Sequence, residues 1–250
     1  ETDNRMVSLM DLGPTVMSII GVDPPKYMDG KAFAGPYQQT ARKYIYGSAD
    51  RFDECTDMQR SVLDGRFVYI KNFMPELPLI YRNRYREQIP MNKQLIELNL
   101  AGKLEGDAAY IFMQTKPIEE LYDLQSDPYE VHNLAKDPAH KEKLIELRTQ
   151  LNQWQTEIND RGFTPETEII SEFWPGMIQP TTLDVMILEQ DNQIKLSCAT
   201  KGASIAYQLG TAIGSNYWQL YTKPIPSKSN EKIRTRAIRI GYKASNITSN

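Results

Sequence analysis

Charged side chains that could bind a ligand are concentrated in one short segment, residues 50–60. The segment contains, in order, Asp50, Arg51, Asp53, Glu54, Asp57 and Arg60. An arginine presents planar donors that suit a sulfate or a carboxylate, and Asp and Glu accept hydrogen bonds from the hydroxyl groups of a sugar. The same charges could instead form structural salt bridges. We predict substrate contact for the first four, hereafter the polar run: Asp50, Arg51, Asp53 and Glu54.

Other residue types that carry out chemistry are scattered along the chain. Cys55 and Cys198 lie far apart and have no metal-ligand spacing. His132 lies in a turn segment and His140 in the first turn of a predicted helix, so both are expected at the surface rather than as acid–base groups. The sequence contains neither a phosphate-binding glycine loop nor a zinc-protease motif. We therefore predict no catalytic residue and no metal ligand in this chain.

The polar run leads into the clearest structural signal, a predicted β-hairpin at residues 59–71. Asp64-Gly65 separates two strand-like runs, a pattern typical of a two-residue turn that places Val62 opposite Phe67. In that register four side chains share one face of the sheet: Arg60, Val62, Phe67 and Tyr69. Further strands are expected at 43–47 and 120–124.

Three helices are predicted. The first lies between Pro14, a common first-turn residue, and Gly21, a common C-terminal stop, and a second lies within 88–106. The third and longest begins after the N-cap Asp137 and ends at Gly162. Its apolar residues repeat at spacings of three and four and form one stripe that should face a core: Leu144, Leu147, Leu151, Trp154 and Ile158.

The C-terminal part of the chain has a different pattern. Residues 161–182 contain three prolines and no clean period, which is typical of a linker. Short strand-like segments then predict a small all-β sandwich, at 185–188, 193–199, 204–208, 217–221 and 232–240. Its aromatic side chains could stack on sugar rings, but we expect them mainly to fill the core: Tyr207, Tyr217, Trp218 and Tyr221.

Composition argues against two classes of function. The 250 residues carry a net charge of −3, which argues against general nucleic-acid binding. Residues 183–250 differ, with nine Lys/Arg against four Asp/Glu, a local charge of +5 that we interpret as a solvated face. No run of about 18 apolar residues occurs, so no membrane-spanning segment is predicted. Because the first residue is Glu1 and not Met, we expect a processed or excised chain.

Residues 1–160 resemble type I, formylglycine-dependent sulfatases. The most specific resemblance is the string Glu-Glu-Leu-Tyr-Asp-Leu at 119–124, followed by Asp-Pro-Tyr-Glu at 127–130 and Asn-Leu-Ala at 133–135. Residues 64–73 resemble a strand of the family's smaller C-terminal subdomain, and residues 11–21 resemble the segment that closes its large domain.

Two further resemblances concern substrate and tail. The polar run, with Asp57 and Arg60, is similar to family members that act on sulfated glycans. The tail resembles the small C-terminal module of chitobiases and hexosaminidases at 202–207, 221–225 and 236–245.

The resemblance implies an α+β fold. We expect a sulfatase C-terminal subdomain, in which a long helix packs on a four-stranded antiparallel sheet, followed by a small all-β sandwich-like module. The expected parts are the end of the large sulfatase domain, the C-terminal subdomain, a linker and the β module, at residues 1–21, 22–162, 163–182 and 183–250.

The resemblance also implies a function, that of a sulfuric ester hydrolase of the alkaline phosphatase-like superfamily acting on sulfated glycans. Such enzymes need a Cys or Ser in a Cys-x-Pro-x-Arg context that has been oxidised to formylglycine, and they hold a divalent cation, usually calcium. Neither Cys55 nor Cys198 has that context. Calcium and formylglycine are therefore expected in a missing N-terminal catalytic domain, and this chain alone is expected to be inactive and to bind neither.

In that setting the chain would brace the catalytic domain, and the polar run would shape the rim of its substrate pocket or form salt bridges to it. Two alternatives remain: a stand-alone carbohydrate-binding or interaction module, and a phosphoesterase relative from the same superfamily. The family implies a bacterial protein in a secreted or periplasmic location. The expected partners are the catalytic domain and a sulfated carbohydrate, and neither nucleic acid nor a membrane.

Overall fold

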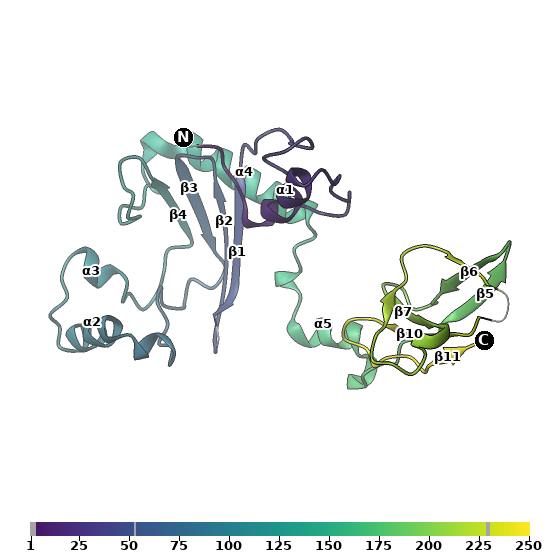
Figure 1. The fold of residues 1–250 in the computed structure, drawn as a ribbon. Helices are drawn as coiled ribbons and strands as arrows, with labels where there is room; N and C mark the ends of the chain where they lie inside the picture. The colour runs from purple at the N-terminus through teal and green to yellow at the C-terminus, as the bar shows by residue number, and fades with distance from the viewer. Residues whose placement is uncertain (1–3, 53, 229–230) are drawn as a thin grey trace. The chain divides into compact units, whose positions relative to one another are not determined.

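The computed structural model describes residues 4–52, 54–228 and 231–250 and divides into two compact units (Figure 1). The first unit is Glu1–Gly162 and the second is Phe163–Asn250. Each unit has its own cluster of buried apolar side chains. The sheets are antiparallel and are combined with helices, so the mixed content of helices and antiparallel sheets expected for the predicted α+β fold is confirmed.

The first unit is built on a four-stranded antiparallel sheet in the order β1-β2-β3-β4. Its strands are β1 (Ile45–Phe52), β2 (Cys55–Leu63), β3 (Phe67–Asn72) and β4 (Glu119–Asp123). Helix α4 (Lys141–Glu157) packs on one face of this sheet (Figure 1). The fully buried side chains of Val62, Tyr69, Leu121, Leu147 and Leu151 join the two. Burial of each contributes about 1.5–3 kcal/mol, which fixes the helix on the sheet.

The β2–β3 hairpin differs in register from the prediction. Leu63 pairs with Val68, and Val62 pairs with Tyr69 rather than with Phe67. The turn is longer because the Asp64 carboxylate accepts hydrogen bonds from the backbone N–H groups of Arg66 and Phe67, at 3.0 and 2.7 Å. A shift of two residues keeps every side chain on its face. The prediction that Arg60, Val62, Phe67 and Tyr69 share one face is therefore confirmed, while the two-residue turn is wrong.

The long helix begins as predicted and ends early. Asp137 caps a short 3₁₀ turn, accepting a hydrogen bond from the Ala139 backbone at 2.9 Å, and α4 follows directly. The helix ends at Glu157 rather than at Gly162. Ile158, predicted to belong to the buried stripe, lies past this end and is 49% exposed.

Two further parts complete the first unit. Helix α1 (Leu12–Ile19) lies in the N-terminal region. The segment between β3 and β4 forms a lobe that carries α2 (Pro90–Leu100) and α3 (Asp107–Tyr110), and Figure 1 places both helices away from the sheet. Neither α2 nor α3 has a buried residue. The 3₁₀ turns in the described parts of the chain are Leu9–Asp11, Arg86–Gln88, Pro138–His140, Arg161–Phe163, Pro175–Met177 and Gly210–Ala212.

The second unit contains two antiparallel sheets that share one core. One sheet has the order β11-β10-β7-β8 and the other β5-β6-β9. Ile194 and Leu196 from one sheet meet Ile205, Ile233 and Ala237 from the other. The strands are β5 (Met186–Gln190), β6 (Gln193–Ser197), β7 (Ser204–Leu209), β8 (Gln219–Leu220), β9 (Ile225–Pro226), β10 (Ile233–Ile238) and β11 (Thr248–Ser249).

The segment before these strands is more ordered than the sequence pattern indicates. It forms α5 (Glu166–Phe173), and the Trp174 indole N–H and the Gln179 amide both donate to the Gly241 carbonyl, at 2.8 and 3.2 Å. These bonds attach the segment to the β strands that follow. None of the helices in the described ranges has the length and apolar character needed to cross a membrane.

Candidate functional site

The structure places three members of the polar run, Asp50, Arg51 and Glu54, at the tip of the β1–β2 hairpin. Asp50 and Arg51 belong to β1, and Glu54 lies in the tight turn before β2. Asp53 lies outside the described residues. The prediction placed this run in a loop between two strands. It instead occupies mostly strand positions, because Arg51 pairs with Thr56 across the hairpin.

Asp50 serves an internal ion pair. Its carboxylate accepts a hydrogen bond of 2.7 Å from the guanidinium of Arg60, whose side chain is only 1% exposed. Arg60 also donates two hydrogen bonds to Asp160, at 2.7 and 2.9 Å. A buried arginine side chain requires partners for its charge. The ion pair between Arg60 and Asp160 supplies them, and it holds the loop after α4 against β2. For Asp50 the geometry therefore supports the alternative to substrate contact, a structural salt bridge.

Glu54 joins the hairpin tip to the lobe between β3 and β4. Its carboxylate accepts hydrogen bonds from the Asn83 side chain at 3.4 Å and from the Arg84 backbone at 3.2 Å. Hydrogen bonds from its own backbone N–H and from that of Arg84 lower the pKa of Glu54. The Cys55 thiol donates to the Arg82 carbonyl at 3.4 Å. The tip thus packs against residues 82–84, and two of these, Arg82 and Asn83, line a pocket.

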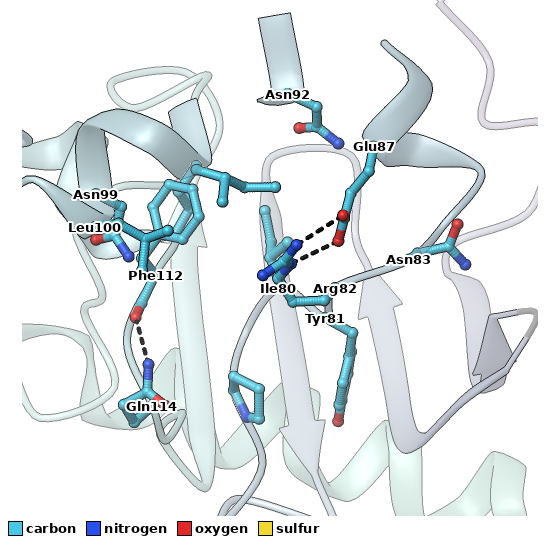
Figure 2. Close-up of a pocket in the computed structure, with 13 residues that line it drawn as sticks. Ile80, Tyr81, Arg82, Asn83, Glu87, Asn92, Asn99, Leu100, Phe112 and Gln114 are labelled. Carbon is cyan, nitrogen blue, oxygen red and sulfur yellow. Dashed lines mark hydrogen bonds and ion pairs between the residues drawn. The ribbon is translucent and has the colours of Figure 1, made fainter. Parts of the chain in front are cut away.

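The pocket has a volume of about 260 Å³ and lies between α2, the segment before it and the segment after α3. In Figure 2, Asn99, Leu100 and Phe112 lie on one side, with Arg82 and Glu87 on the other. Its remaining lining side chains include Pro78, Ile80, Tyr81, Asn83, Asn92, Ile96, Ile111 and Gln114. Carboxamides and apolar side chains therefore predominate in its walls.

The pocket was not predicted, although part of its signal is present in the sequence. Asn92, Ile96, Asn99 and Leu100 are spaced four, three and one residues apart, which places them on one face of α2. The opposite wall, at residues 78–87, follows from how the lobe folds back and has no local pattern.

A buried lysine supports one wall of the pocket. The Lys116 side chain is fully buried, and its ammonium contacts the Asp57 carboxylate and, at 3.4 Å, the Tyr81 hydroxyl. The same ammonium lies 5.3 Å from the centre of the Tyr81 ring. Burial, and then the negative charge of Asp57, raise the pKa of Tyr81 to about 12. Tyr81 is therefore neutral and held in place at physiological pH.

The histidines make local contacts. His132 is 75% exposed, and His140 lies within hydrogen-bonding distance of the capping residue Asp137, at 2.9 Å. Across the described ranges no group of three or more His, Cys, Asp or Glu side chains could hold a metal ion. We assign neither a metal site nor a catalytic step to the histidines.

The aromatic residues of the second unit divide into two groups. Tyr207 and Tyr221 pack against the core, with ring centres 6.5 Å apart and planes nearly perpendicular. Tyr217 is 68% exposed, and Trp218 lies over the guanidinium of Arg234 at 5.8 Å. The expectation that these residues fill the core is confirmed for the first two and is wrong for Tyr217.

Helix α1 buries its polar side chains and exposes most of its apolar ones. Its small polar side chains face inward: Thr15 accepts a hydrogen bond from the Phe33 backbone at 3.1 Å, and Ser18 accepts one from the Tyr37 backbone at 2.9 Å. Apolar side chains on the other face of α1 and at its C-cap residue, Ile20, are 48–69% exposed: Leu12, Val16, Ile19 and Ile20. A contiguous apolar stripe of this kind marks an interaction surface.

Comparison with known proteins identifies sulfatase relatives. Over 247 residues, 98% of the chain, the sequence is 41% identical to an ulvan-active sulfatase of Formosa agariphila and covers 41% of that protein. It is 27% identical over 198 residues to the human N-sulphoglucosamine sulphohydrolase, covering 72% of the chain and 38% of that protein. The chain thus spans about two fifths of the length of these relatives.

Family models and solved structures were also compared with the chain. No protein-family model matches the chain. Among solved structures, a 2-O GAG sulfatase aligns with a TM-score of 0.40 and 23% identity, covering 60% of this chain and 25% of that one. The sequence relatives therefore carry the comparison, and they are sulfatases.

Proposed function

We propose that this chain is the C-terminal part of a sulfatase that hydrolyses sulfate esters of a sulfated polysaccharide. The observation that carries the proposal is the alignment of 98% of the chain, at 41% identity, with an ulvan-active sulfatase. An alignment of this length includes the four-stranded sheet, its packed helix and the C-terminal β strands. The sulfated polysaccharide ulvan is accordingly the substrate that we place first.

In this proposal the nucleophile and the cation belong to a catalytic domain outside the 250 residues. The absence of the Cys-x-Pro-x-Arg context at Cys55 and Cys198 supports this division. The relative is more than twice as long as its match to this chain, which leaves room for such a domain. Formylglycine and calcium would both be held there, and this chain would supply neither ligand nor nucleophile.

The exposed stripe of α1 is the surface that we assign to the catalytic domain. Its members are Leu12, Val16, Ile19 and Ile20. A separate binding partner is the less economical occupant, because the relative is more than twice as long as its match to this chain and so has a further part that could cover the stripe. Burial of four such side chains contributes several kcal/mol, at about 25 cal/mol per Å² of apolar surface. The chain would thereby brace the catalytic domain.

The tip of the β1–β2 hairpin is the part that we assign to the rim of the substrate pocket. Arg51 and Glu54 are exposed there, whereas Asp50 is held by the buried Arg60. We retain Asp53 in the same role from its sequence position. Residues 183–250 form an appended β module of the chitobiase type in this proposal, and the protein is secreted or periplasmic.

The core contacts of Tyr207 and Tyr221 do not support the alternative of a stand-alone sugar-binding module. The test of the main proposal measures sulfate release from ulvan oligosaccharides. The full-length protein, expressed with the enzyme that forms formylglycine, should release sulfate, and the 250-residue chain should release none. Failure of the full-length protein to release sulfate from ulvan or from a small aryl sulfate would contradict the proposal. Release by the isolated chain would contradict the division of roles.

A further inference from the structure

We propose that the pocket between α2 and residues 78–87 binds one uncharged sugar residue of the polysaccharide chain. The inference rests on the proposed function for the identity of the polymer, and on the pocket itself for the chemistry. A volume of about 260 Å³ is of the size needed for a single hydroxyl-rich ring and is too small for a folded segment of protein.

The polar groups in the pocket have hydrogen-bonding capacity left over. The Asn99 carboxamide makes no hydrogen bond to any described residue, so it has two donors and an acceptor to offer. Asn92 uses its amide N–H on the Arg86 carbonyl, at 3.2 Å, and Gln114 uses its own on the Phe112 carbonyl, at 3.3 Å. The side-chain oxygens of Asn92 and Gln114 remain available as acceptors. Groups that both donate and accept suit vicinal hydroxyls.

The charge in the pocket is already neutralised. Among the described residues that line it, Arg82 and Glu87 are the only charged ones, and they form a doubly hydrogen-bonded ion pair at 2.6 and 2.7 Å (Figure 2). A sulfate or carboxylate entering the pocket would have to compete with Glu87 for the guanidinium. A neutral ring has no such cost, and it can accept hydrogen bonds from the outer edge of the pair. The chemistry therefore favours an unsulfated, uncharged residue.

Apolar side chains provide the other half of the recognition. Phe112, Ile96 and Leu100 line the pocket beside Asn99. The C–H faces of a sugar ring pack on such surfaces while its hydroxyls reach the carboxamides, the usual division in small-molecule pockets. The opposite wall is positioned by the Glu54 contacts to residues 83–84. The pocket is thus continuous with the hairpin tip that we assign to the rim. One polysaccharide could therefore contact the rim with one sugar residue and place a neighbouring sugar residue in the pocket.

Isothermal titration of the full-length protein with desulfated ulvan oligosaccharides tests this inference, because these ligands bind without turnover. We expect saturable binding that does not depend on ionic strength. Asn99→Leu should weaken it about tenfold, the loss of one to two hydrogen bonds to the ligand. Phe112→Ala should weaken it to a similar extent. The matched control is Asn152→Leu, the same substitution at an exposed position of α4, which should leave affinity unchanged.

Each contrary outcome has a defined meaning. Wild-type affinity in both pocket variants would overturn the inference. A stronger, salt-sensitive affinity for sulfated oligosaccharides that is lost in Asn99→Leu would overturn the neutral ligand. Unchanged affinity with a lower thermal midpoint of the full-length variant would assign the pocket to packing against another part of the protein, and would also overturn it. Sulfate release by the wild-type protein is measured separately, so failure of the proposed function remains distinguishable from failure of this site.

Discussion

Arg60 and Asp160 form a doubly hydrogen-bonded ion pair across 100 residues of sequence, with side chains only 1% and 8% exposed. The pair joins strand β2 to the loop that follows α4. Gly162 completes the arrangement: its backbone N–H donates to Asp160 at 3.0 Å, and a Cβ at this position would lie 2.0 Å from the Arg60 guanidinium. A side chain at this position would therefore displace the Arg60 guanidinium from its ion pair, which holds the end of the first unit against the sheet.

Asp160→Asn should lower the free energy of unfolding by about 3 kcal/mol, because it leaves the buried Arg60 without its main counter-charge. Asp50→Asn removes the other partner of Arg60 but should cost less than about 1 kcal/mol, because that carboxylate is 48% exposed and screened. Urea unfolding of the 250-residue chain measures both. Equal losses in the two variants would show that burial of the partner does not decide the energy.

Acid should destabilise the first unit between about pH 4 and pH 2. Burial raises the pKa of Asp11, but hydrogen bonds from Arg42, Lys31 and Ser8 outweigh it and lower the pKa to about 2, and the Arg60 hydrogen bonds lower that of Asp160 to about 2. The ordinary value for both is 3.8. The unfolded chain thus binds more protons in this range, and stability falls as pH falls, by roughly 2 kcal/mol per group.

The acid effect has an internal control. Asp160→Asn cannot titrate, so this variant should lose less stability than the wild type between neutral pH and about pH 2, by roughly the 2 kcal/mol that this one group contributes. Urea midpoints at both pH values give the comparison. A loss of the same size in the variant would place the acid sensitivity elsewhere in the chain.

Lys116→Met should destabilise the chain by about 3–5 kcal/mol, because it leaves Asp57, which is 15% exposed, without its cation. Adding Asp57→Asn to that variant should recover part of the loss, since the unpaired charge is then removed. Urea unfolding of the two variants decides between charge and packing. Further destabilisation by the second substitution would indicate that the lysine acts through its packing alone.

The sequence predicts the core of the first unit better than its turns. Alternation across 59–71 places Val62 and Tyr69 inward, and helical spacing identifies Leu144, Leu147 and Leu151, because burial follows periodicity. The hairpin register was wrong because the Asp64 side chain caps a longer turn, an interaction that the Asp-Gly pattern does not encode.

The candidate site is less predictable for a physical reason. The role of Asp50 depends on Arg60, which in turn depends on Asp160, and no local pattern connects residues 100 positions apart. The pocket likewise requires α2 to meet residues 78–87. Only the face shared by Asn92 and Asn99 could be predicted in advance. Sequence patterns identify which residues are polar and close in the chain, and tertiary contacts decide which of them are available to a ligand.

Val16→Asp tests whether α1 docks on the rest of the protein. Val16 is 58% exposed in the first unit, so the substitution should leave the urea midpoint of the 250-residue chain within experimental error. In the full-length protein the same change would bury a charge at the proposed contact and should cost about 2–3 kcal/mol, measured as a lower unfolding midpoint. Ile145→Asp, at a 46% exposed position of α4, is the matched control and should be neutral in both contexts.

If Val16→Asp destabilises the short and the long protein equally, the stripe belongs to the internal packing of this unit. If it affects neither, the stripe faces solvent and the catalytic domain must contact the chain elsewhere. Only a loss confined to the longer protein supports docking through α1.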